Sequence, residues 1–227
     1  MSAADPAPAE PVLRRDAARN RAKILDAASA VIGESGVDVC VETIARRAGV
    51  GVGTLYRRFP TKELLIEAVV DEVLRGMLSA ATTALSDESP ANGLAEFIRA
   101  AGRLQYEHAG CLTRLWNSST GELRDQIETA GRALLSRAQD GGAVRRDLVY
   151  EDVVVVFWSL RGVIEATATV SPDAWQRHLD LLLTSLAPTD RRLEHPPLTP
   201  DQVQRARVAV ALHDGAGTEP APVGPPT

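Results

Sequence analysis

The stretch AGVGVGTLYRRF, residues 48–59, constrains the fold of this chain more than any other part of the sequence. Its three alternating glycines suit either a phosphate-binding loop or a tight turn between two short helices. A dinucleotide-binding loop needs a third glycine where this chain has Thr54 or Tyr56. A P-loop needs Gly-Lys-Ser/Thr, whereas Gly53 is followed directly by Thr54. The preceding residues also have the pattern of a helix and not of a strand, so the glycines favour the turn.

The residues around these glycines have the spacing of a helix-turn-helix. Two helices that cross closely need a small residue on the first, and Ala45 is suitably placed. Gly49 follows four positions later, where the turn needs a residue that tolerates a positive φ angle. Leu55 is the apolar anchor by which the second helix packs back onto the first. The sequence therefore predicts two short helices, at 41–49 and 52–59.

The rest of the chain is also predicted to be helical. Hydrophobic residues make up 44% of it but aromatic residues only 4%, so Leu, Val and Ala must fill the core, which favours helices over sheets. The segment 151–170 is rich in β-branched residues and also suits a strand, but its length favours a buried helix. The expected fold class is all-α. The expected helices span 16–35, 41–49, 52–59, 60–86, 94–108, 111–117, 121–139, 151–170 and 171–187.

Capping residues mark several of these boundaries. Gly36 suits the C-cap of the first helix, and Thr61 suits the N-cap of the long helix that follows Pro60. Ser171 and Pro172 suit the N-cap and first position of the helix at 171–187.

These elements divide the chain into four regions. Residues 1–13 are rich in Ala and Pro and are predicted to be a disordered tail. A helix-turn-helix unit, 14–62, and a helical body, 63–190, follow. Residues 191–227 are a Pro-rich tail in which 199–212 is compatible with a short helix.

The net charge of −5 is unevenly distributed along the chain. Residues 14–62 contain ten Lys or Arg and five acidic residues, so this unit carries +5 and the remainder carries −10. A basic unit on an acidic body can bind a polyanion locally while the whole protein stays soluble.

Several other classes of protein are not indicated. No apolar run is long enough to cross a membrane, and the N-terminus lacks an apolar signal core, so a cytoplasmic protein is expected. Cys40 and Cys111 lie far apart and suggest neither a disulfide nor a metal site. No nucleophile–base pair, paired carboxylates or metal-ligand spacing indicates an enzyme, so neither a cofactor nor a metal is expected.

The stretch GVDVCVETIARRAGVGVGTLYRRFPTKELL, 36–65, resembles the DNA-binding head of TetR-type (TetR/AcrR) transcriptional regulators. The resemblance covers about residues 15–70, and the rest is similar in outline. It implies a three-helix head, 14–62, that binds DNA, joined by a long helix to a body, 63–190, that pairs two subunits and holds a small effector. The matching residues are Ile44-Ala45, Ala48-Gly49-Val50, Gly53-Thr54-Leu55-Tyr56, Phe59-Pro60 and Lys62-Glu63.

The resemblance also implies a function and a set of DNA contacts. The protein is expected to bind a two-fold operator in double-stranded DNA as a homodimer, most often as a repressor that a small molecule releases. With Leu55 facing inward, Arg57 or Arg58 is the candidate to read a guanine through two hydrogen bonds. Thr54, Tyr56 and Lys62 match the family's phosphate-contacting residues. The candidate DNA-binding residues are Val52, Gly53, Thr54, Tyr56, Arg57, Arg58 and Lys62, with Arg21 and Lys23 of the first helix.

Two positions depart from the family pattern. Cys40 stands where the family usually has Ser or Thr at the start of the second helix, and a thiol is a weak cap and a weak phosphate donor. Gly51 and Val52 stand where the family usually has Ser and a polar or basic residue. The N-cap of the recognition helix is therefore weakened, and Val52 is suited to contact a thymine methyl group.

The body gives weaker signals. The apolar segments 151–170 and 172–187 are the candidates for the dimer interface. Arg161 and Glu165 also fit a simple ion pair one helical turn apart. The alternative is a helical DNA-binding regulator without an effector or with a protein partner. The residues that could line an effector pocket are Phe97, Tyr106, His108, Trp116, Trp158 and Arg161.

Overall fold

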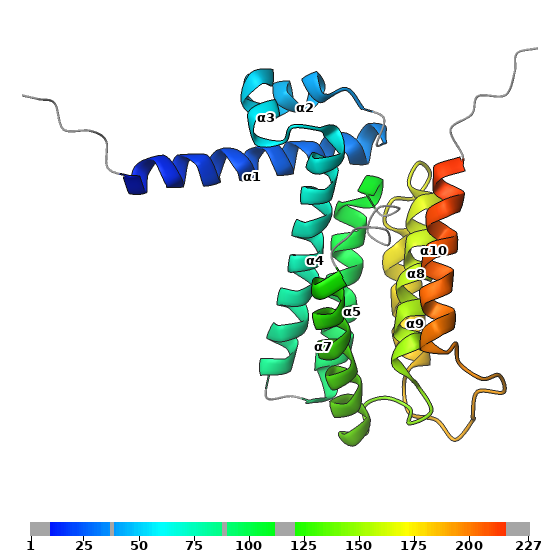
Figure 1. The fold of residues 1–227 in the computed structure, drawn as a ribbon. Helices are drawn as coiled ribbons and strands as arrows, with labels where there is room; N and C mark the ends of the chain where they lie inside the picture. Colours follow the sequence, from blue (N-terminus) through cyan, green and yellow to red (C-terminus); the bar gives the residue numbers. More distant parts are fainter. Residues whose placement is uncertain (1–9, 37–38, 88–89, 112–120, 217–227) are drawn as a thin grey trace, which may run out of the picture.

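The computed structural model describes residues 10–36, 39–87, 90–111 and 121–216 of the 227-residue chain. All regular structure in these ranges is helical, as the sequence predicts. A head of three helices lies across the top of an elongated body, and helix α4 runs from the head down into the body (Figure 1).

The head consists of α1 (Glu10–Ser35), α2 (Val41–Ala48) and α3 (Val52–Arg58). The predicted disordered tail is wrong for residues 10–13, because α1 begins six residues before Asp16. Pro11 is tolerated in a first helical turn, and Leu13, Arg14 and Arg15 favour the helix that follows it. At the other end, the N–H of Gly36 (φ 78°) donates to the carbonyl of Ile32 at 2.8 Å, which confirms the predicted C-cap.

The turn between α2 and α3 has the predicted geometry. Gly49 has φ 68°, in the left-handed region, and its N–H donates to carbonyls of the last turn of α2. Ala45 and Leu55 are each 1% exposed and lie in the same apolar core as Ile24 and Ile32 of α1. The small side chain of Ala45 thus lets α3 pack closely onto α2 and α1.

The head continues into α4 (Lys62–Ser86), which packs on α5 (Pro90–Glu107) and α7 (Gly121–Asp140). The Oγ1 of Thr61 accepts a hydrogen bond from the N–H of Leu64 at 3.2 Å, so the predicted N-cap is confirmed. Helix α5 begins at Pro90, four residues earlier than predicted, because proline is well tolerated in a first helical turn. A short 3-10 helix, η1 (Ala109–Cys111), follows α5, and the remainder of the predicted helix at 111–117 lies outside the described residues.

The body is completed by α8 (Tyr150–Thr167), α9 (Ala174–Ser185) and α10 (Pro200–Ala216). The β-branched segment is helical, as its length predicts. The predicted N-cap of α9 is wrong: Ser171 lies in a turn, where its carbonyl accepts from the N–H of Ala174, and the N-cap is Asp173.

Helix α10 extends beyond the predicted 199–212. Its start is stabilised by reciprocal hydrogen bonds between Thr199 and Gln202, in which each side chain accepts from the other residue's backbone N–H, at 3.2 and 2.8 Å.

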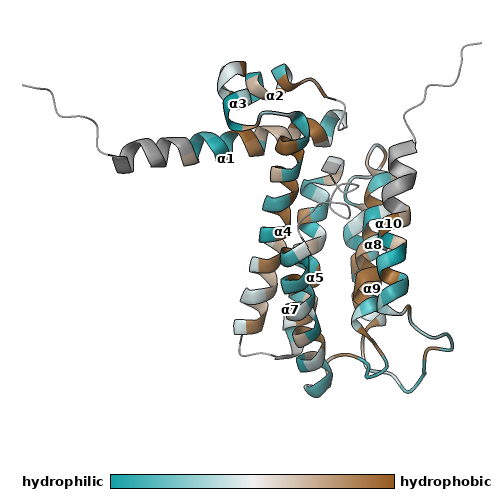
Figure 2. Cartoon of the chain, in the orientation of Figure 1, coloured by the Kyte–Doolittle hydropathy of each residue, from teal (hydrophilic) through white to brown (hydrophobic). Residues whose placement is uncertain are grey.

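Apolar residues gather where α1 meets the first turns of α4 and along α8 and α9, while polar residues cover most outward turns (Figure 2). No helix among the described residues is long and apolar enough to span a membrane.

Candidate nucleic-acid interface and a cavity in the body

Helix α3 turns one side toward the core of the head and leaves the other open. Leu55 is buried at 1% exposure, and Phe59, directly after the helix, at 6%. Gly53, Tyr56 and Arg57 are exposed on the opposite side. Residues at this spacing follow one face of a helix. The open face of α3 therefore consists of Gly53 and Arg57, with Tyr56 at its edge.

Arg58 lies on a different side of α3. It lines a surface hollow together with Arg21 and Asp26 of α1 and Glu72 of α4. An Arg21 guanidinium nitrogen is 3.8 Å from a carboxylate oxygen of Glu72. Two predicted DNA-binding arginines thus share this hollow with two carboxylates, whereas Arg57 is on the open face.

The remaining basic candidates surround α3. Lys23 is exposed on α1, and Lys62 is half-buried at the start of α4. Arg47, which the sequence does not single out, donates to both carboxylate oxygens of Glu34 at 2.7 Å. This ion pair, from one guanidinium nitrogen to both carboxylate oxygens, ties α2 to the end of α1.

The N-terminal ends of α2 and α3 both lack a side-chain cap, as the two departures from the family pattern predict. Neither Cys40 nor Gly51 caps its helix through a side chain. The Cys40 thiol hydrogen-bonds to the carboxylate of Glu42 instead, and this bond lowers the pKa of Glu42.

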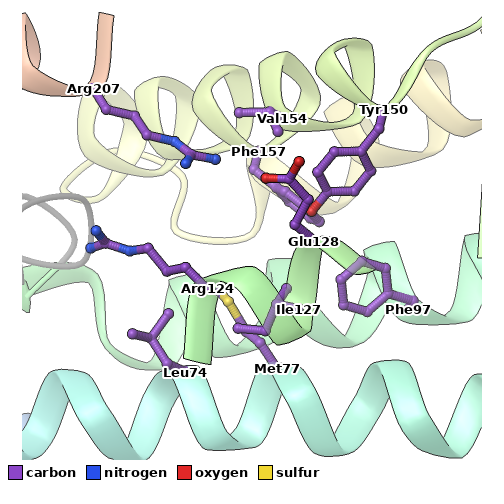
Figure 3. Close-up of a pocket in the computed structure, with 10 residues that line it drawn as sticks. All are labelled: Leu74, Met77, Phe97, Arg124, Ile127, Glu128, Tyr150, Val154, Phe157 and Arg207. Atoms are coloured by element: carbon purple, nitrogen blue, oxygen red, sulfur yellow. The ribbon is translucent and has the colours of Figure 1, made fainter. Parts of the chain in front are cut away.

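The body contains a small cavity between α4, α5, α7, α8 and α10 (Figure 3). Its volume of about 50 Å³ is room for a few water molecules, whereas pockets for drug-sized ligands are several times larger. It is lined by Leu74, Met77, Phe97, Arg124, Ile127, Glu128, Tyr150, Val154, Phe157 and Arg207.

The structure places the predicted effector-pocket residues in different parts of the body. Phe97 lines the cavity and meets Phe157 edge to face, with ring centroids 5.8 Å apart. Tyr106 stacks on Trp175 beside a surface groove, at 5.5 Å. Trp116 lies outside the described residues, and the cavity wall does not include His108, Trp158 or Arg161. Arg161 instead donates to Glu165 at 2.7 Å, the ion pair that the sequence offers as the simpler interpretation.

The charged groups of the cavity are the part that sequence reasoning missed. Arg124 and Glu128 share the inward side of α7 with Ile127, at helical spacing, and this spacing is the signal that could have found them. Arg207 gave no such signal because its segment reads as a polar tail. Burial lowers the pKa of Arg124, and the positive charge of Arg207 lowers it further.

Two ion pairs meet at Arg132, beside the cavity. Arg132 donates to Glu128 at 2.8 Å and to the buried carboxylate of Glu151 at 2.6 Å. The Arg132 guanidinium also lies over the ring of Tyr150, 5.0 Å from its centroid. Burial and the charge of Glu128 raise the pKa of Tyr150 to about 12, so its hydroxyl stays protonated.

The head and body also meet at η1. His108 Nδ1 hydrogen-bonds to the hydroxyl of Ser29 on α1, and burial lowers the pKa of His108. A Cβ at Gly110 would overlap the carbonyl oxygen of Ile32 and lie 2.5 Å from its carbonyl carbon. Only glycine leaves room for α1 at this position.

The described residues contain no group of three or more His, Cys, Asp or Glu side chains that could hold a metal ion.

Both parts of the chain match known families. Residues 24–69 match the sequence profile described as "Bacterial regulatory proteins, tetR family", and residues 89–188 match "Transcriptional regulator SbtR-like, C-terminal domain". Helix α10 lies beyond the second match.

Individual relatives of the chain agree with these family matches. The chain is 29% identical over 188 residues to the HTH-type transcriptional repressor KstR of Mycobacterium tuberculosis, covering 78% of this chain and 86% of the relative. It is similar to a TetR regulator from Mycobacterium vanbaalenii (31% identity, 77% of this chain, 99% of that chain, TM-score 0.59). It is also similar to one from Streptomyces coelicolor (34% identity, 74% and 99%, TM-score 0.58). The chain therefore belongs to the TetR family of bacterial DNA-binding transcriptional regulators, which are not enzymes.

Proposed function

We propose that this protein is a repressor that binds a two-fold operator in double-stranded DNA as a homodimer and leaves it when a small-molecule effector enters the body. Its KstR relatives are transcriptional repressors. The open face of α3 supports the operator, the outer sides of α8 and α9 support the dimer, and the cavity in the body supports the effector. Such a repressor acts in the cytoplasm, where bacterial DNA lies.

The observation that carries the proposal is the open face of α3. Gly53 offers no side chain there, so the DNA backbone can approach the helix closely. Arg57 stands one turn further along the same face and is the residue we assign to a guanine. Thr54, Tyr56 and Lys62 are assigned to phosphates, which set the register of the helix on the duplex.

Arg57→Ala tests this assignment against two matched variants. Duplexes selected from a random pool supply the operator, and fluorescence anisotropy at several salt concentrations gives the affinity. Arg57→Ala should cost about 1–3 kcal/mol of binding free energy and relax the preference at one base pair. Lys62→Ala should weaken binding to all sequences and reduce the salt slope by about one.

Arg58→Ala is the matched control, because it removes the same charge from the next residue of α3. Its loss should be smaller and independent of sequence, since Arg58 shares its hollow with Asp26 and Glu72. Wild-type affinity and preference in Arg57→Ala would contradict the assignment of α3 to the major groove.

The outer sides of α8 and α9 support a dimer. Val155 of α8 is 40% exposed and Leu181 of α9 is 61% exposed. Ser159, one turn from Val155, hydrogen-bonds to His178, one turn before Leu181, at 3.2 Å, so the two outer sides join into one surface. We call this the α8–α9 surface and assign it to the partner subunit.

Two contacts support effector release. Leu74 and Met77 of α4 line the cavity, and α4 begins directly beneath the head. The joint of η1 with α1 makes a second connection through His108 and Gly110. A ligand that enlarges the cavity would shift the population of head positions away from the spacing that fits the operator.

The small volume of the cavity favours one alternative, a regulator without an effector. Operator affinity measured across a panel of small molecules distinguishes the two. Release by at least one compound supports the effector, and unchanged affinity throughout the panel supports the alternative.

A further inference from the structure

We propose that the cavity in the body binds the carboxylate of a small acid with an apolar chain, and that Arg124 of α7 and Arg207 of α10 hold that carboxylate. Its regulatory meaning rests on the proposed function, but the binding itself does not. Both arginines line this cavity, Arg124 from α7 and Arg207 from α10, and the Arg207 guanidinium points toward Glu128 (Figure 3).

Two positively charged side chains line this cavity. Arg124 and Arg207 stand there with Glu128, and the charge of Arg207 lowers the pKa of Arg124. Glu128 already accepts from Arg132, so its charge is shared with a third arginine. Two guanidiniums in partly buried surroundings repel each other, and a monoanion between them would offset this repulsion.

The chemistry of the groups selects a carboxylate. A guanidinium presents planar N–H donors that match the two oxygens of a carboxylate, and such charge-assisted hydrogen bonds are about twice as strong as neutral ones. Tyr150 adds a hydroxyl that stays protonated and can donate to the same anion.

The side of the cavity away from Arg207 is apolar, so the other end of the ligand is expected to be apolar too. Leu74, Met77 and Phe97 lie on the α4 and α5 side of the cavity, away from Arg207. A hydrocarbon chain seated there is removed from water and contributes roughly 25 cal/mol per Å² of apolar surface. Since the cavity holds only about 50 Å³, a ligand must push side chains apart, and the unbranched side chain of Met77 adapts readily.

Helix α10 is suited to close this site. Among its described side chains Val203 alone is buried, so α10 is held to α8 by a limited apolar contact. Arg207 is one turn further along and half-buried at the cavity. An acid that pairs with both Arg207 and Arg124 would fasten α10 to α7 across the cavity.

The test compares acids with alcohols of the same length. Hexanoic, octanoic and decanoic acid and the matching primary alcohols are titrated into the full-length protein by isothermal titration calorimetry near pH 7.5. The best-fitting acid should bind about tenfold or more tightly than its alcohol. Arg124→Gln and Arg207→Gln should each remove this preference, because the acid loses far more affinity than the alcohol does.

Arg205→Gln is the matched control, because Arg205 lies on the exposed side of α10 and pairs with Asp201 at 3.0 Å. It should keep the acid preference. Equal affinity for acids and alcohols, a preference that survives in both cavity variants, or no binding by any member of the series would each overturn the proposal.

Operator affinity measured on the same samples separates this inference from the proposed function. An acid that binds through both arginines but leaves operator affinity unchanged supports the site and contradicts effector release. A compound that releases DNA equally in the wild type and in both cavity variants, with no acid preference, supports release and overturns the carboxylate site.

Discussion

Gly49 ends α2 in the turn and Gly53 lies in the first turn of α3, and a side chain at these two glycines would have opposite effects. Gly49 has φ 68°, a conformation that costs an L-residue about 1–2 kcal/mol, although no atom lies within 4 Å of its would-be Cβ. Gly53 has ordinary helical geometry and equally open surroundings. A side chain at Gly49 therefore strains the fold, whereas one at Gly53 projects from the open face of α3.

Gly53→Ala should separate stability from DNA binding. Alanine in place of a helical glycine is expected to stabilise the protein by about 0.5–1 kcal/mol, while its methyl group hinders the close approach of DNA and weakens operator binding. Gly49→Ala should lower the free energy of unfolding by about 1 kcal/mol. Urea unfolding and operator anisotropy measure both effects, and a Gly53→Ala variant with wild-type affinity would argue against close approach at that point.

For a single residue, the sequence predicts its position on a helix but not which side chains of other helices lie beside it. The spacing of Ala45, Gly49 and Leu55 is local, and the turn follows it. Arg57 and Arg58 are equivalent candidates in the sequence. Only the packing of α1 and α4 beside α3 shows that Arg58 shares a hollow with Asp26 and Glu72. That distinction depends on residues distant in the chain, which no local pattern contains.

At the scale of elements, the 3-10 helix η1 of the body packs tightly against α1 of the head. Gly110→Ala places a methyl group against the backbone of Ile32, so α1 and η1 must separate. We expect a loss of about 1–3 kcal/mol in stability, as for other overpacked sites, together with a changed operator affinity because the head moves. Thermal unfolding and operator anisotropy measure the two effects.

Gly33→Ala provides the comparison for that variant. Gly33 lies in α1 next to Ile32, but no atom is within 4 Å of its would-be Cβ, so the change should be neutral or stabilising. If Gly110→Ala unfolds and binds like Gly33→Ala, the joint does not transmit strain to the head.

The elements also show where sequence reasoning stops. Long helices such as α4 and α8 follow from hydrophobic periodicity, and Thr61 marks a true boundary. Ser171 is an equally good cap by residue type, yet the chain makes a turn there and α9 starts three residues later. The cavity depends on α10 packing against α8, and the periodicity of a polar segment does not reveal where that segment packs.

Across the whole molecule, the basic head is kept apart from the acidic body. The unit 14–62 carries +5 against −10 elsewhere, and α2 and α3 lie on the side of α1 that faces away from the body (Figure 1). A polyanion is therefore attracted to one end of the molecule. Two subunits paired through their bodies would present two such ends to neighbouring turns of one duplex.

Leu181→Glu tests this pairing. Leu181 is 61% exposed in the single subunit, so a carboxylate there costs little in the monomer but would be buried unpaired in the dimer. Sedimentation at micromolar concentration should show the variant as a folded monomer and the wild type as a dimer. Leu193→Glu is the matched control, because Leu193 is 51% exposed and lies outside the α8–α9 surface. It should remain dimeric.

Operator binding should follow the oligomeric state. A monomer contacts one half-site at a time, so Leu181→Glu is expected to lose most of its affinity for the full operator while its α3 remains intact. Its affinity for an isolated half-site should equal that of the wild-type protein. This measurement distinguishes lost subunit pairing from damage to the head. A Leu181→Glu variant that stays dimeric would place the subunit interface on another face, and a wild-type monomer would remove the two-fold operator from the proposal.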